Sequence, residues 1–133
     1  MKRLFFVLLV VAVAGSMLVG CGDDGGGSTS SVEAPADVEV LEGDAVEILA
    51  VDNAFDPDAA QVAVGTEVTF RNAGRNDHNV VPEDADADWA VDAADFTPGD
   101  EASFTFDEPG VYRFYCSIHG TLTAGMPGVL VVE

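Results

Sequence analysis

Residues 111–132 read VYRFYCSIHGTLTAGMPGVLVV and decide the fold class of the chain. Tyr112, Phe114 and Cys116 alternate with polar Arg113 in this stretch, and alternate residues of a β-strand point to the same face of a sheet. If Arg113 faces water, Cys116 points toward the core at the end of its strand. The apolar end of the stretch predicts a second strand, central in its sheet.

Short apolar runs of period two, separated by turn residues, fill the chain upstream. In residues 61–71 we expect two half-buried strands paired around a turn at Gly65, with Val68 and Phe70 facing inward. Residues 102–106 alternate in the same manner, and no helical segment of ordinary length is evident. The sequence therefore predicts an all-β domain.

The first residues have the pattern of a secretory signal. A short basic start precedes an apolar run at residues 4–18, which is too short and wrongly flanked for a stable transmembrane helix. The run ends in LVGC at residues 18–21, which resembles the lipobox of bacterial lipoproteins, where the peptide is cut before the cysteine and the cysteine carries lipid. We expect a signal peptide at 1–20 and a lipid on Cys21. An ordinary signal peptide cut at small residues, or an uncleaved anchor, is the alternative.

Residues 21–36 are rich in Gly, Ser and Asp and lack apolar periodicity, which is typical of a flexible tether. The folded domain is expected at 37–133, a length that suits a small sandwich. Together these segments predict an exported protein, anchored to the cell membrane by lipid and facing outside the cytoplasm.

The two cysteines of the chain have different fates in this interpretation. With Cys21 assigned to lipid, Cys116 has no disulfide partner, although the signal directs it to an oxidising compartment where disulfides are usual. A solitary exported thiol is buried, reactive or a metal ligand.

The charge is one-sided, with 24 acidic residues against 5 Lys and Arg and a formal net charge of −19. Lys2 and Arg3 leave with the signal, so the remaining basic residues are Arg71, Arg75 and Arg113. Such a surface repels nucleic acid, which we exclude as a partner. The acidic excess serves either as a docking face for a basic redox partner or as an adaptation to solubility or high salt, and charge alone does not decide.

Every soft or borderline metal ligand outside the signal and lipid site lies in two segments. His78 lies in the strand-like segment 72–81, and Cys116, His119 and Met126 lie in the stretch quoted first. A thiolate, two imidazoles and a weak thioether form the ligand set of blue-copper electron-transfer sites. Each residue taken alone is also explained as a core or surface side chain, and only the clustering favours a metal. Zinc can bind two His and one Cys, but no motif supplies a base for zinc hydrolysis.

These motifs resemble the cupredoxins, in particular the plastocyanin and pseudoazurin group of blue copper proteins. The matching stretches are FDP at 55–57, VGTEVTFRN at 64–72, HNV at 78–80, GVYRFYCSIHG at 110–120 and GMPG at 125–128. The resemblance covers nearly the whole domain after the tether. It implies a Greek-key β-sandwich that holds one type 1 copper ion near one end.

The resemblance also assigns roles by position. His78, Cys116 and His119 are implied as equatorial copper ligands and Met126 as the axial ligand, while Asn79 would support them by hydrogen bonds. Six residues separate His119 from Met126, more than in the better-known members of the family. A backbone oxygen is therefore the alternative to the Met126 sulfur as axial ligand.

The implied function is single-electron transfer by a monomer, without substrate chemistry, between redox proteins such as a cytochrome or an oxidase or reductase. His119 would be the edge through which the electron passes, surrounded by an apolar patch of Gly120, Leu122 and Pro127. A copper oxidase or nitrite reductase would need further copper centres and therefore more His. A copper carrier or storage protein is the remaining alternative, although the chain has no Met-rich or His-rich tract.

Overall fold

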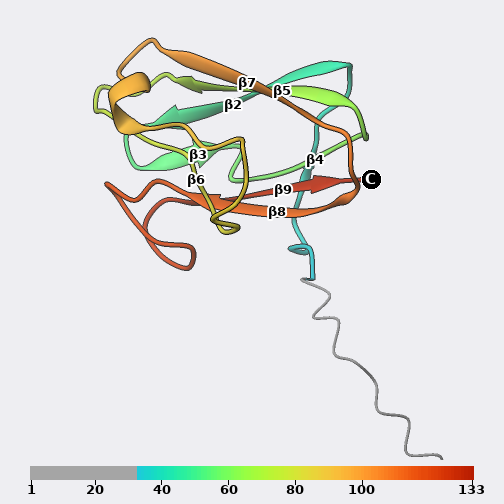
Figure 1. Cartoon of the computed structure of the whole chain (residues 1–133). Helices are drawn as coiled ribbons and strands as arrows, with labels where there is room; N and C mark the ends of the chain where they lie inside the picture. The colour runs from blue at the N-terminus through green and yellow to red at the C-terminus, as the bar shows by residue number, and fades with distance from the viewer. Residues whose placement is uncertain (1–32) are drawn as a thin grey trace, which may run out of the picture. The chain divides into compact units, whose positions relative to one another are not determined.

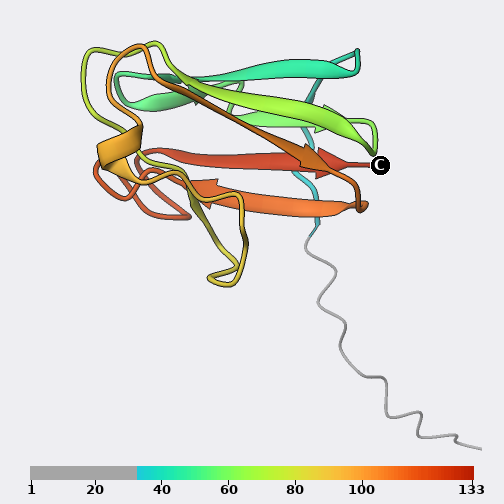
Figure 2. The ribbon, with the colours of Figure 1, turned by 45° about the horizontal axis from the view of Figure 1, so that its top comes forward.

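The computed structural model describes residues 33–133, and these form nine strands in two facing mixed sheets (Figures 1 and 2). The strand order is β1-β4-β9-β8-β6 in one sheet and β3-β2-β5-β7 in the other. Within the described residues the only helical element is a single 3₁₀ turn, η1, at Ala93–Asp95. The predicted all-β class is confirmed.

The bounds of the strands show how often the chain changes sheet. The five-stranded sheet contains β1 (Glu39–Val40), β4 (Ala59–Val62), β6 (Val81–Pro82), β8 (Gly110–Tyr115) and β9 (Pro127–Val132). The four-stranded sheet contains β2 (Ala45–Val51), β3 (Ala54–Asp56), β5 (Thr66–Asn72) and β7 (Glu101–Phe106). From β3 to β8 every connection crosses from one sheet to the other, and β2 pairs with β5 in parallel. This pattern is consistent with the sandwich that the resemblance implies.

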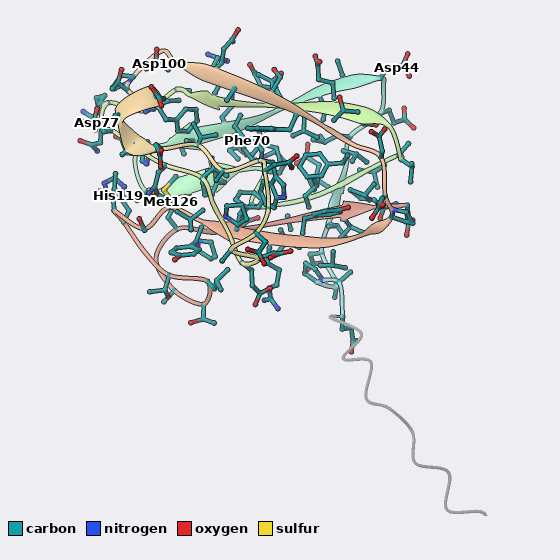
Figure 3. All side chains as sticks on the ribbon, viewed as in Figure 1. Asp44, Phe70, Asp77, Asp100, His119 and Met126 are labelled. Atoms are coloured by element: carbon teal, nitrogen blue, oxygen red, sulfur yellow. The ribbon has the colours of Figure 1, made fainter. Side chains whose placement is uncertain are left out.

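The core lies between the sheets and is aromatic. Along β5 the residues alternate between buried and partly exposed, so Val68 and Phe70 face inward as the sequence predicts. The ring of Phe70 meets Phe114 of β8 edge-on at 5.2 Å and stacks with Trp89, from the loop after β6, at 6.4 Å. Figure 3 shows Phe70 between the layers. These rings join the two sheets.

The strand pair expected around Gly65 is wrong. β4 and β5, on either side of that turn, belong to different sheets. Gly65 N–H donates to Phe106 O at the end of β7 (2.7 Å), and Val64 N–H donates to Glu133 O just after β9 (3.3 Å). A glycine turn between two alternating runs leads either into a hairpin or across a sandwich, and only these long-range partners decide which.

The predicted signal peptide at 1–20, the lipid site Cys21 and the tether as far as residue 32 lie outside the described residues. In residues 33–133 no helix is long and apolar enough to cross a membrane.

Candidate metal centre

The predicted ligands come together at one end of the sandwich. His78 lies in the connection between β5 and β6, Cys116 directly follows β8, and His119 and Met126 lie in the loop between β8 and β9. Figure 3 shows His119 and Met126 beside each other at this end, and Asp44 at the opposite end. The strands thus supply a frame, and loops supply the side chains.

The sulfur of Cys116 faces one nitrogen of each histidine. Its Sγ lies 3.6 Å from Nδ1 of His78 and 3.5 Å from Nδ1 of His119. The three candidate ligand atoms lie within 4.8 Å of one another, in the one such cluster found among residues 33–133. His78 and Cys116 are fully buried, whereas His119 is partly exposed. An ion placed among the three atoms would be shielded from water on the His78 side.

Met126 is fully buried, and its main chain lies beside that of Cys116. Its carbonyl oxygen accepts a hydrogen bond from Cys116 N–H at 3.0 Å. The main chain of Met126 is therefore fixed to the residue that carries the thiol, in spite of the long loop between them.

The segment that carries His78 is not a strand, contrary to the strand-like interpretation of 72–81. β5 ends at Asn72, and the backbone N–H of His78 donates to Phe96 O at 3.2 Å instead of to a neighbouring strand. The segment is irregular because polar bonds to a second loop, rather than a strand ladder, hold its backbone.

Asn72 organises this irregular segment and was missed by the sequence interpretation. Its Nδ2 donates to the carbonyl oxygens of Asn76 (2.9 Å) and Phe96 (2.8 Å), and its Oδ1 accepts from Gly74 N–H (3.0 Å). The side chain is almost completely buried. One signal could have found it: parity along β5 places a polar amide on the same inward face as Phe70.

Asn79 joins the two ligand-bearing segments. Its Nδ2 donates to Ser117 Oγ at 2.8 Å, and its Oδ1 accepts from Ser117 N–H at 2.8 Å. Because Asn79 follows His78 and Ser117 follows Cys116, the pair of bonds fixes one ligand relative to the other. This is the kind of support that the resemblance implies for Asn79.

The electrostatic environment favours a neutral His78. Burial, and after it the nearby His119, holds the pKa of His78 below its usual value. A neutral imidazole keeps a lone pair free for a metal. Nδ1 of His78 faces the cluster, and its Nε2 is the one buried side-chain nitrogen or oxygen without a hydrogen-bond partner in the described residues.

The donor set fits copper. One sulfur and two imidazole nitrogens converge and no carboxylate joins them, which is a soft to borderline set of the kind found in blue-copper sites. With buried Met126 adjoining, the site is compatible with one type 1 copper ion.

A two-sheet sandwich with a His, Cys, His and Met site at one end defines a cupredoxin. Residues 35–133 match the family model for copper binding proteins of the plastocyanin/azurin family. The chain belongs to this family, as its sequence motifs indicate.

Individual relatives show how widely this domain is used. The chain is 35% identical to chloroplastic plastocyanin of Silene latifolia subsp. alba over 89 residues, which is 60% of this chain and 53% of that protein, so it spans about half of that relative's length. The oxidised plastocyanin of Dryopteris crassirhizoma is similar in structure, with a TM-score of 0.56, 25% identity and coverage of 66% of this chain and 100% of that one. A copper-containing nitrite reductase of Thermus scotoductus SA-01 is similar over 70% of this chain but only 23% of its own, with 29% identity and a TM-score of 0.56. Domains similar to this chain thus occur in plastocyanins and within a nitrite reductase.

Proposed function

We propose that this protein carries single electrons through one type 1 copper ion bound by His78, Cys116 and His119, with Met126 as axial ligand. The observation that carries the proposal is the convergence of the Cys116 sulfur with two Nδ1 atoms at the end of the sandwich. When bound, copper supplies the Cu(II)/Cu(I) couple, in which one electron is taken up or released without proton transfer.

The protein keeps the ligand residues in fixed positions. A site that keeps one geometry in both oxidation states needs little reorganisation, and small reorganisation makes electron transfer fast. The two bonds between Asn79 and Ser117 and the bonds of buried Asn72 restrain both ligand segments without help from the metal. Complete burial of His78 and Cys116 excludes water from most of the site.

His119 is the proposed route for the electron, because it is partly exposed while His78 and Cys116 are buried. The expected apolar patch of Gly120, Leu122 and Pro127 is partly exposed as well. Neighbouring Ile118, half exposed, adds apolar surface that the sequence interpretation overlooked. A small, transient contact of this monomer with a redox protein, such as a cytochrome or an oxidase or reductase, suits rapid exchange of partners.

Loading the protein with Cu(II) tests the copper assignment. We expect an intense thiolate-to-copper absorption band and a type 1 spin-resonance spectrum, both lost in Cys116→Ser because serine offers no thiolate. A loaded protein without this band, or a band that survives in Cys116→Ser, would refute the assignment.

Electron transfer can be distinguished from other uses of the copper ion by testing whether the protein gives up electrons or the copper itself. Both histidines of the chain belong to the cluster, so the chain itself has no imidazole left for the further copper centres of an oxidase. We expect repeated exchange of electrons with a reduced cytochrome while the copper stays bound. Transfer of copper to a metal-free acceptor, faster than electron exchange, would instead identify a copper carrier.

We further propose that the chain is exported and held at the membrane by a lipid on Cys21, with the Gly-, Ser- and Asp-rich residues 21–36 as tether. The lipobox-like LVGC at 18–21 supports this. Mass spectrometry of the native protein should find an N-terminal peptide that begins at lipidated Cys21, and Cys21→Ala should move the protein to the soluble fraction. An unmodified Cys21 in the membrane fraction would contradict the proposal.

A further inference from the structure

The loop between His119 and Met126 contains a closed turn of its own. Thr121 N–H donates to Ala124 O at 2.8 Å, and the two residues form an isolated antiparallel bridge. Thr123 N–H reaches the hydroxyl of Thr121 at 3.4 Å. Residues 121–124 are therefore held together by hydrogen bonds within the turn, and none of these bonds involves a candidate ligand.

At the base of this turn two glycines come into backbone contact. A Cβ added to Gly120 would lie 2.5 Å from Ala124 O and still closer to Met126 N. A Cβ added to Gly125 would lie 2.7 Å from Gly120 Cα and still closer to His119 O. Side chains do not tolerate such approaches, so only glycine fits at both positions.

The contact shortens the path between the ligands. Since a Cβ on Gly125 would lie 2.7 Å from Gly120 Cα, the two Cα atoms are within about 4.2 Å of each other, close to the ~3.8 Å that separates consecutive residues. The distance that the backbone spans between His119 and Met126 is therefore almost as short as it would be without the four residues of the turn.

We propose that Gly120 and Gly125 form a backbone clasp that positions His119 and Met126 as a pair and keeps the turn at 121–124 outside the site. The clasp explains how a six-residue spacer still leaves Met126 buried with its carbonyl bonded to Cys116 N–H at 3.0 Å. Figure 3 shows the resulting proximity of His119 and Met126. The clasp rests on the proposed function only in treating His119 and Met126 as copper ligands.

Gly65 provides a matched control for the clasp. It has a φ of 86°, against 85° for Gly125, but a Cβ on Gly65 would meet nothing within 4 Å, and its turn is not part of the site. Gly65→Ala and Gly125→Ala therefore introduce the same backbone strain, and only Gly125→Ala breaks the contact. Gly120→Ala breaks the contact without a positive φ.

The first experiment compares these three variants, each loaded with Cu(II). In Gly120→Ala and Gly125→Ala we expect copper to be lost to a chelator at least tenfold faster than in the wild type. We also expect a shifted thiolate band and a raised reduction potential, because a displaced Met126 sulfur donates less charge to Cu(II). Gly65→Ala should keep the wild-type band, potential and rate of copper loss. If all three variants behave alike, the clasp does not position the ligands.

The second experiment removes residues 121–124. The deletion joins Gly120 directly to Gly125, and Gly-Gly suits a two-residue hairpin turn. We expect the variant to fold and keep the wild-type copper band, with copper loss within threefold of the wild type. Loss of the band in a folded deletion variant would show that the turn is needed and would overturn the clasp.

The two proposals fail in different ways. A wild-type protein without the thiolate band refutes the copper function. The metal-free proteins then still test the clasp. The unfolding equilibrium constant of Gly125→Ala should exceed that of Gly65→Ala at least tenfold, and equal constants would overturn it.

Discussion

The core between the sheets and the ligand end of the same sandwich are held by different forces. In the core, Phe70, Phe114 and Trp89 contact one another through their rings. At the ligand end, Asn72 and Asn79 hold irregular backbone through hydrogen bonds. Apolar packing thus defines the fold, whereas a few amides define where the ligands meet.

The two kinds of contact differ in energy and in what they control. Burying a large aromatic ring contributes several kcal/mol, whereas one hydrogen bond contributes about 1 kcal/mol net. Changes in the core should therefore alter stability more than the metal site, and changes in the amides should alter the site out of proportion to their effect on stability.

Phe70→Ala should have the largest effect on stability. Removing a fully buried ring that joins both sheets should lower the free energy of unfolding by about 3–5 kcal/mol, with the milder Phe70→Leu as control. Chemical denaturation of the metal-free protein measures the loss. The copper spectrum of the folded fraction should stay unchanged. A displaced thiolate band would show that the two regions are not separable.

Asn72→Ala should have the next largest effect on stability, and it should also change the metal site. It leaves the carbonyl of Asn76 without its donor and Phe96 O with only the N–H of His78, so we expect the free energy of unfolding to fall by about 2–3 kcal/mol and copper to be released faster from a loosened His78 segment. Asn76→Ala is the control, because the exposed side chain of Asn76 makes no hydrogen bond in the described residues. Equal behaviour of the two variants would remove Asn72 from the account of the site.

Asn79→Ala should cost about 1 kcal/mol or less in stability but should clearly accelerate copper loss to a chelator, because it separates the His78 segment from the Cys116 segment. Ser117→Ala removes only the bond to the hydroxyl and keeps the Ser117 N–H bond to Asn79 Oδ1. Its effect should be smaller. The reverse order would mean that the hydroxyl, rather than the amide, holds the two segments together.

Glu47→Gln should have the smallest effect, about a factor of two in the unfolding equilibrium constant, because its ion pair with Arg71 is exposed. The hydrogen bond from Arg71 lowers the pKa of Glu47. The stability that this ion pair contributes is therefore fully present above the unfolded-state pKa of about 4.3 and is lost as the pH falls through the lower folded-state pKa. Denaturation at pH 7 and at acid pH measures how the unfolding equilibrium constants of Glu47→Gln and wild type differ, and high salt should reduce this difference.

Glu67→Gln is the control for this ion pair. Glu67 is an exposed residue on β5 that takes part in neither ion pair found in residues 33–133. If Glu67→Gln shows the same dependence on pH, the Arg71 contact does not cause the effect.

The core was predictable because strand parity is a local signal. Alternation alone identified the inward faces of β5 and β8, including Phe70, Phe114 and the inward direction of Cys116. The candidate ligands were predictable for another reason. The chain has so few histidines, thiols and thioethers that their grouping stands out without any geometry.

Long-range partners were not predictable by the same means. The turn at Gly65 reads like a hairpin, yet it crosses between the sheets, because its hydrogen-bond partners Phe106 and Glu133 are distant in sequence. Likewise, the contact between Gly120 and Gly125 depends on how the loop closes, which no periodicity encodes. Folding decides these features through contacts that a single sequence does not reveal.

X-ray absorption at the copper edge of the Cu(II)-loaded protein tests the central claim most directly. If Cys116 and both histidines bind the same ion, the nearest shell should contain one sulfur and two imidazole nitrogens, and the sulfur should vanish in Cys116→Ser. A shell of nitrogen and oxygen alone in the wild-type protein would contradict the assignment and, with it, the electron-carrier function.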